Sequence, residues 1–113
     1  MKIKTTIDDS VVILAIEGSL SSEEKINFEK EVNQYKDRQY SLVLDLSDVT
    51  FIDSASLGTI VKYYALFQKN GRHLLLSNMS KQIYEVFNLT GVTRQIRIFD
   101  TTRAAVDFIR GNS

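Results

Sequence analysis

Residues 51–58 read Phe-Ile-Asp-Ser-Ala-Ser-Leu-Gly, and within this stretch the chain changes from the pattern of a strand to that of a helix. Asp and Ser are both preferred at helix N-caps, so either Asp53 or Ser54 begins the helix. If Asp53 is the cap, Ser54 lies in the first turn with its hydroxyl exposed. A glycine inside a helix costs roughly 0.8–1 kcal/mol relative to alanine, so Gly58 indicates a close approach to the backbone by a neighbouring strand or by a partner.

The helix that begins here is predicted to end near residues 70–71, where Asn-Gly suits a left-handed C-terminal cap. The spacing of its apolar side chains predicts a buried stripe made of Leu57, Ile60, Val61, Tyr64 and Phe67. Lys62, Tyr63 and Lys69 are placed on the exposed face, where they could extend a partner surface, although an aromatic residue on a helix more often serves packing than recognition.

The N-terminal region predicts a β-hairpin. Residues 2–7 and 11–17 are β-branched runs separated by the turn-forming cluster Asp-Asp-Ser at 8–10. Gly18 is expected to end the second strand.

Strands and helices then alternate to the end of the chain. The predicted elements are a helix from Ser21 or Ser22 to about residue 37 that buries Phe28, Val32 and Tyr35; a strand at 40–46, separated from 51–52 by a polar step at 47–48; a strand at 73–77; a helix that Ser80 caps and Gly91 stops; a strand at 96–99; and a helix that Asp100 caps, followed by a frayed tail at 111–113. This order predicts an α/β fold: a mixed, mostly parallel sheet with about four helices and an antiparallel hairpin strand at one edge.

Length and composition bound the function. The 113 residues are the usual size of one domain, with 43% apolar and 25% charged residues and no Cys, so we expect a single domain over 1–113 without disulfides or thiolate chemistry. Fourteen basic residues balance fourteen acidic ones, which predicts no nucleic acid partner. Neither a signal-peptide core nor an apolar run of about 20 residues occurs, so no membrane association and a cytoplasmic location are expected.

The residue supply argues against an enzyme. There is one His, His73, and no phosphate-binding glycine loop, nucleophile elbow or paired-His metal motif. Asp45, Asp48 and Asp53 surround the end of one predicted strand and in principle offer a Mg²⁺ or phosphoacceptor site of the receiver type. The acidic pair and the late Lys of such a site are missing, so we predict no catalytic residue, no metal site and no cofactor.

The stretch at 51–58 resembles the signature of STAS domains, and specifically of bacterial anti-sigma factor antagonists: an aromatic or aliphatic residue, then Asp-Ser-(Ser/Thr/Ala)-Gly-Leu-Gly. The resemblance extends over almost the whole chain, including the strand at 44–47, the Asn-Gly turn at 70–71 and the Leu-Thr-Gly-Val element at 89–92.

This resemblance implies a switch protein without an active site of its own. In the family the serine directly after the Asp is the phosphoacceptor, and Ser54 occupies that position. The expected partners are a serine-kinase anti-sigma factor, which binds the unphosphorylated protein, and a PP2C-type phosphatase, which removes the phosphate. The residues expected to form the partner-binding surface are Ser21, Asp53, Ser54, Ala55, Ser56, Leu57 and Gly58.

Two positions depart from the family pattern. Ser56 stands where the family usually has Gly, and it is a second candidate phosphoacceptor. Ser21 stands where an Asp is common in relatives, near the partner surface.

Two other functions remain open at this point. One is a STAS module that acts only as a scaffold or docking unit and is never phosphorylated at Ser54. The other is a small enzyme or nucleotide-hydrolysing module that uses Asp45, Asp48 and Asp53, for which no phosphate-cradling loop is present.

Overall fold

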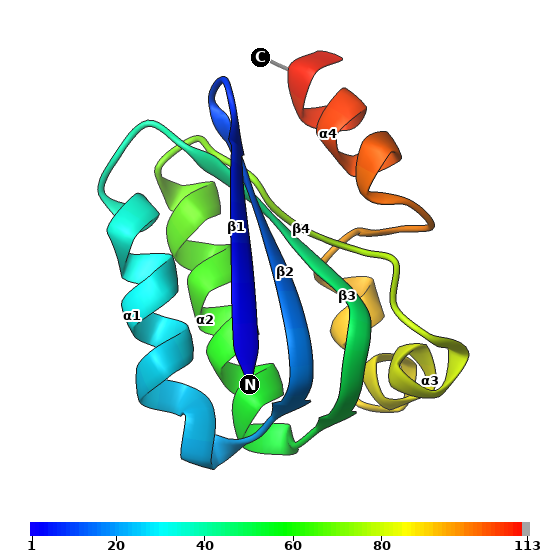
Figure 1. Ribbon diagram of the computed structural model, residues 1–113. Helices are drawn as coiled ribbons and strands as arrows, with labels where there is room; N and C mark the ends of the chain where they lie inside the picture. The colour runs from blue at the N-terminus through cyan, green and yellow to red at the C-terminus, as the bar shows by residue number, and fades with distance from the viewer. Residues whose placement is uncertain (112–113) are drawn as a thin grey trace.

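The computed structural model describes residues 1–111, which form a five-stranded sheet with four α-helices (Figure 1). The elements in chain order are β1 (Lys2–Asp8), β2 (Val11–Leu20), α1 (Lys25–Lys36), β3 (Ser41–Ile52), α2 (Ser54–Lys69), β4 (Leu74–Ser77), α3 (Lys81–Leu89), β5 (Ile98–Phe99) and α4 (Thr102–Gly111), with 3-10 turns at Ser22–Glu24 and Val92–Arg94.

The sheet has the predicted mixed architecture. Its strand order is β1-β2-β3-β4-β5, in which β1 and β2 are antiparallel and each later neighbour pair is parallel. Helices α1 and α2 lie together on one side of the sheet, whereas α4 lies on the other (Figure 1). The carboxyl ends of β2 and β3 therefore reach the same edge, where α2 begins.

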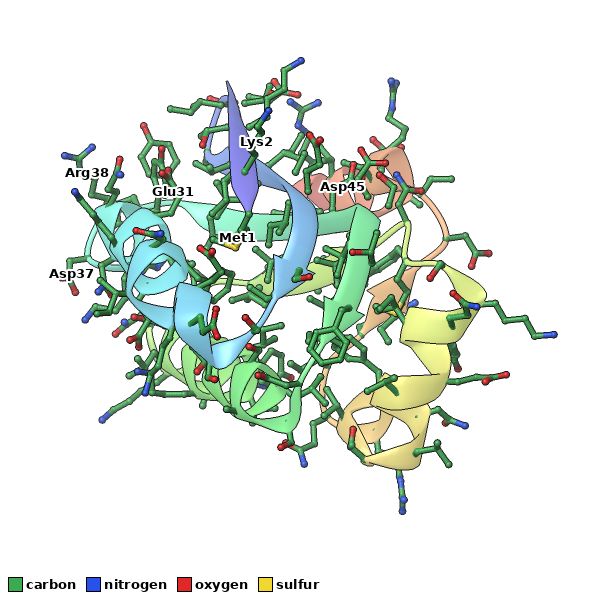
Figure 2. All side chains as sticks on the ribbon, turned by 60° about the horizontal axis from the view of Figure 1, so that its bottom comes forward. Met1, Lys2, Glu31, Asp37, Arg38 and Asp45 are labelled. Atoms are coloured by element: carbon green, nitrogen blue, oxygen red, sulfur yellow. The ribbon has the colours of Figure 1, made fainter. Side chains whose placement is uncertain are left out.

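The hairpin forms as predicted, but β2 does not stop at Gly18. Asp8 pairs with Val11 around a two-residue turn, and Asp9 has the positive φ of 58° that primed hairpin turns require at this position. At Gly18 the chain takes a φ of 96° and shifts its register against β3, and the strand continues to Leu20. Met1, beside the start of β1 in Figure 2, packs near Gly18: a Cβ on Gly18 would be in ordinary van der Waals contact with the Met1 Cα, at 3.7 Å.

Strand β3 is also longer than predicted. The polar step at residues 47–48 does not break it: between the Ala15–Asp45 and Glu17–Asp48 pairs β3 carries one extra residue, and the pairing with β2 resumes at Asp48. The two irregularities let β2 and β3 stay paired to their ends, where Leu20 lies opposite Ile52. As a result the strand delivers the chain directly to the start of α2.

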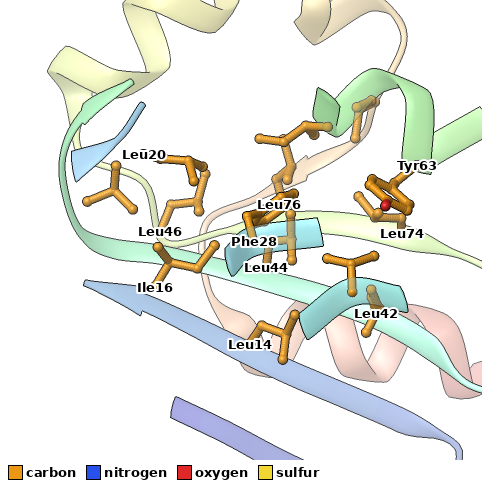
Figure 3. Close-up of a cluster of buried hydrophobic side chains, with 14 of the residues drawn as sticks. Leu14, Ile16, Leu20, Phe28, Leu42, Leu44, Leu46, Tyr63, Leu74 and Leu76 are labelled. Atoms are coloured by element: carbon orange, nitrogen blue, oxygen red, sulfur yellow. The ribbon is translucent and has the colours of Figure 1, made fainter. Parts of the chain in front are cut away.

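One large apolar cluster fills the space between the sheet and helices α1, α2 and α3 (Figure 3). It includes the predicted residues of α1, which are Phe28, Val32 and Tyr35. The predicted stripe of α2 is correct for Leu57, Ile60 and Phe67, while Val61 and Tyr64 are only half-buried.

Tyr63 was predicted on the exposed face of α2, and that prediction is wrong. Its side chain is 3% exposed, because the flank of α2 that faces α1 is buried as well as the stripe that faces the sheet. Its hydroxyl donates to Asn33 Oδ1 of α1 at 2.9 Å. The packing of α1 against α2 therefore buries the Tyr63 ring. A prediction based only on the apolar stripe that faces the sheet places this ring in solvent.

The C-terminal elements follow the prediction with two corrections. Ser80 caps α3 by accepting from the Ile83 amide at 3.2 Å, and β5 is shorter than expected, at two residues. Thr101, not Asp100, caps α4, because its Oγ1 accepts from the Ala104 amide at 3.0 Å. Helix α4 covers the second face of the sheet over a small cluster of Val11, Val43, Leu75, Ala105, Val106 and Ile109. Gly111, predicted as the first residue of a frayed tail, is the last described residue of α4, and residues 112–113 of that tail lie outside the described residues.

Candidate functional site

The junction between β3 and α2 lies against the loop that follows β2. The Asp53 amide donates to the carbonyl of Leu20 at 3.4 Å, and the Ser22 amide donates to Asp53 Oδ2 at 2.8 Å. Two segments about 30 residues apart in the sequence therefore form one continuous surface at the carboxyl end of the sheet.

Asp53 is the N-cap of α2, which settles the choice left open by the sequence. Its backbone is extended (φ −102°, ψ 170°), and its Oδ1 accepts from the Ser56 amide at 2.8 Å. The amide and hydroxyl of Ser56 and the amide of Ser22 stabilise the carboxylate, so they lower the pKa of Asp53. A carboxylate held ionised in this way also suits the positive end of the helix dipole.

Ser54 lies in the first turn of α2 with an exposed side chain. Ala55 and Gly58 are exposed next to it on the same helix. No atom lies within 4 Å of the position that a Cβ on Gly58 would take. The neighbouring strand proposed as one reason for this glycine is therefore absent from its surroundings, and the helix backbone is open to an incoming molecule.

The other predicted site residues point differently. Ser56 is 6% exposed and Leu57 is 3% exposed, so both side chains belong to the interior of the domain. Ser21 is half-buried directly after β2, and its carbonyl accepts from the Glu24 amide at 2.9 Å. We call the surface formed by Ser21, Asp53, Ser54, Ala55 and Gly58 the Ser54 face.

Residues beyond the predicted set border this face. Ser22 and Lys25 line a small hollow of about 10 Å³ together with Ala55 and Ser56. Ser22 enters the site through its backbone amide, which no sequence pattern indicates. Phe51 is 52% exposed, although the next residue, Ile52, is buried. Side chains of consecutive strand residues point to opposite faces, so two adjacent apolar residues at the end of a strand could have indicated that one of them is exposed beside the motif.

The acidic alternative finds little support in the geometry. Asp45 Oδ1 accepts from the Ser47 amide at 3.0 Å, and Asp53 is occupied by the two amides that it caps. Within residues 1–111, no group of three or more His, Cys, Asp or Glu side chains is placed to hold a metal ion. His73 is half-buried with its ring edge-on to Phe108, at a centroid distance of 5.7 Å. None of the helices in the described part of the chain has the length and apolar character needed to cross a membrane.

A sheet of this topology with a capped, serine-bearing helix start at its carboxyl edge is the arrangement of a STAS domain, and the chain belongs to that family: the sequence model of the STAS domain matches residues 2–105. Curated relatives carry the name anti-sigma factor antagonist, provisionally in two Thermotoga proteins and as an anti-sigma-B factor antagonist in a Bacillus subtilis protein. The chain is 34% identical over 106 residues to a Thermotoga maritima protein provisionally named an anti-sigma factor antagonist, with 92% of this chain and 94% of the relative aligned.

Solved structures agree with this assignment. The crystal structure of a Thermotoga maritima protein with the same provisional name superposes with a TM-score of 0.89 at 32% identity, covering 96% of this chain and 94% of the other. The anti-sigma factor antagonist SpoIIAA in its unphosphorylated form superposes with a TM-score of 0.82 over 97% of both chains. At 16% identity, the second likeness shows the shared fold alone.

Proposed function

We propose that this chain is a phosphorylation-controlled anti-sigma factor antagonist. In its unphosphorylated form it binds a serine-kinase anti-sigma factor through the Ser54 face and so releases a sigma factor. Phosphorylation of Ser54 by that kinase ends the binding, and a PP2C-type phosphatase restores it. The observation that carries the proposal is an exposed serine in the first turn of α2, directly after a capping aspartate, at the acceptor position of the STAS motif.

The domain acts by binding and not by catalysis in this proposal. The whole 113-residue chain serves as one STAS domain in the cytoplasm, with no cofactor, metal, nucleic acid or membrane partner. Its anti-sigma factor partner is the class implied by the names of its relatives.

Phosphate at Ser54 affects a complex more than it affects the domain. It adds about −1.5 to −2 charges beside the ionised carboxylate of Asp53, at a position that the free protein leaves in water. A partner seated flush on the Ser54 face has to desolvate this charge. A loss of about 4 kcal/mol in binding free energy lowers the affinity roughly a thousandfold.

Ser54 is favoured over Ser56 as the acceptor on exposure. Ser56 is 6% exposed, and its amide is bound to Asp53. A kinase would reach its hydroxyl only after the first turn of α2 had opened. The hydroxyl of Ser54 needs no such change.

The proposal is tested first by intact-mass spectrometry of the protein from its native cell, with and without phosphatase treatment. Peptide mapping across residues 53–62 then locates the phosphate. We expect a single phosphatase-sensitive phosphate on Ser54. Phosphate on Ser56 instead would move the acceptor by two residues into the buried position.

A binding experiment then tests the switch. The wild-type protein and Ser54→Ala are expected to capture an anti-sigma factor kinase from native lysate, whereas Ser54→Asp is expected to lose it. Ser10→Asp is the matched control, because it adds the same charge at an exposed position at the opposite end of β2. If Ser54→Asp retains the partner as well as Ser10→Asp does, the scaffold function replaces the switch.

A further inference from the structure

The outer edge of β1 is uncovered. Within residues 1–111, β1 pairs with β2 alone, and six of its seven residues are exposed. Figure 1 looks onto the sheet from the β1 side, and no helix passes in front of that strand. An open edge of this length presents a row of unpaired backbone groups and is a template for pairing with another strand.

The hairpin geometry identifies which backbone groups face outward. Asp8 and Val11 flank a two-residue turn and form a hydrogen-bonded pair, so the amide and carbonyl of Asp8 point toward β2. The carbonyl of Ser10 accepts from the Ser41 amide of β3 at 2.9 Å. The backbone groups of the next residue, Val11, therefore point the other way, toward β1, which agrees with the Asp8–Val11 pair. The outward groups of β1 are therefore those of its odd-numbered residues, Ile3, Thr5 and Ile7.

The sequence of β1 is self-complementary about Thr5. When two copies pair antiparallel with Thr5 opposite Thr5, Ile3 of each copy faces Ile7 of the other, and Lys2 faces Asp8. We propose that β1 is a self-association surface through which a second copy of this chain extends the sheet across a two-fold axis. All three outward-facing residues of each strand then take part in hydrogen-bonded pairs.

Neighbouring registers fit less well. Moving the centre to Lys4 places Lys4 opposite Lys4, and like charges directly opposite each other destabilise a strand pair. Moving it to Thr6 keeps a Lys–Asp pair but shortens the overlap to residues 4–8 and leaves Ile3 without a partner on the other strand. The Thr5-centred register alone combines opposite charges at both ends with the full set of outward backbone groups.

Side chains on the two faces of β1 are compatible with this pairing. Ile7 is 54% exposed in the single chain and gains an apolar neighbour across the seam. Thr5 Oγ1 donates to Glu31 of α1, the helix beside β1 in Figure 2, and Asp8 forms an ion pair with Arg110 of α4 at 2.6 Å. These contacts lie on the faces of the sheet, so the edge stays open. No residue of the Ser54 face lies on β1, so the inference is independent of the proposed function.

Single-cysteine variants of the full chain test the register. The natural sequence has no Cys, and Thr5 and Thr6 are both exposed neighbours on β1. In the proposed pair the two residues at position 5 have Cα atoms about 5.5 Å apart, within disulfide range, whereas those at position 6 are about 8 Å apart. Under mild oxidation Thr5→Cys is expected to form covalent dimer at least tenfold faster than Thr6→Cys. Equal rates, or a faster Thr6→Cys, would overturn the proposal.

Sedimentation velocity over a concentration series tests association without a cross-link. Thr5→Pro removes one outward-facing amide, and proline is tolerated on an edge strand where that amide faces solvent. Thr5→Val is the matched control, because it also loses the hydroxyl but keeps the amide. We expect a reversible dimer for the wild type and for Thr5→Val, and a dimer dissociation constant at least tenfold higher for Thr5→Pro. Thermal unfolding establishes that both variants fold. A wild-type chain that stays monomeric up to millimolar concentration, or equal dimerisation of the two variants, contradicts the proposal.

Discussion

At the scale of single residues, Gly58 is the position where stability and binding are expected to conflict. A glycine in an exposed helix interior costs roughly 0.8–1 kcal/mol relative to alanine, and the space around Gly58 has room for a methyl group. The domain by itself has no need of this glycine. Its presence is explained if a partner packs against the helix backbone beside Ser54.

Gly58→Ala is therefore predicted to stabilise the free domain by about 0.5–1 kcal/mol and to weaken partner binding at least fivefold. Chemical denaturation and a titration with the anti-sigma factor measure the two effects. Ala65→Gly, at an exposed position two turns further along α2, is the control and should lower stability while leaving binding unchanged. Undiminished binding by Gly58→Ala would show that the partner does not approach the backbone here.

The sequence predicted individual site residues where side-chain chemistry decides the outcome. Asp and Ser are both good caps, so the motif located the helix start but left Asp53 and Ser54 as equal candidates, and the exposure of Ser54 followed only once Asp53 was seen to cap. The link from the Ser22 amide to Asp53 could not be predicted, because every residue except proline carries the same backbone amide. The burial of Ser56 depends on how α2 sits against its neighbours, which one residue's identity does not reveal.

At the scale of elements, Arg72 holds the connection between α1 and β3. Its guanidinium donates to the carbonyls of Tyr35 at 3.1 Å and Tyr40 at 2.9 Å, and also to those of Lys36 and Arg38. These groups include carbonyls at the C-terminal end of α1 that have no partner within the helix. Burial lowers the pKa of Arg72, which nevertheless stays charged.

Replacing Arg72 with Met should lower the free energy of unfolding by about 2 kcal/mol, because several partly buried carbonyls lose a charged donor. The stability of Arg72→Lys should lie between those of the wild type and Arg72→Met, because a lysine ammonium cannot reach all four carbonyls. Lys69→Met, which removes an exposed charge at the end of α2, is expected to have almost no effect. Urea denaturation compares the variants, and equal stabilities of Arg72→Met and Lys69→Met would contradict this role.

Elements were predictable where one local signal dominated. Apolar periodicity located α1 and α2, and turn residues located the hairpin. The misplaced boundaries share a cause: the pairing of β2 with β3 carries both strands through Gly18 and residues 47–48, although glycine and polar residues usually end strands. Likewise, only the packing of α1 on α2 accounts for buried Tyr63. Contacts between distant segments override local preference at these places.

At the scale of the whole molecule, phosphorylation is expected to leave the fold intact. Ser54 lies outside the apolar clusters, and the positive end of the α2 dipole offsets part of the added charge, by roughly 0.3–1 kcal/mol. We therefore predict that the phosphorylated and unphosphorylated proteins melt within about 3 °C of each other. Calorimetry on the two purified forms measures this. A fall of more than about 8 °C would mean that the phosphate acts by opening the domain and not by blocking a surface.

The double contact of Asp53 also affects how mutagenesis of this protein should be interpreted. One carboxylate secures both the start of α2 and the loop after β2. An alanine scan of the Ser54 face would therefore score Asp53 as a hot spot even if no partner atom touched it, because its removal loosens both segments of the proposed binding surface. Contact and scaffolding can be separated at this position only by measuring, for each variant, the order of the free protein alongside its affinity.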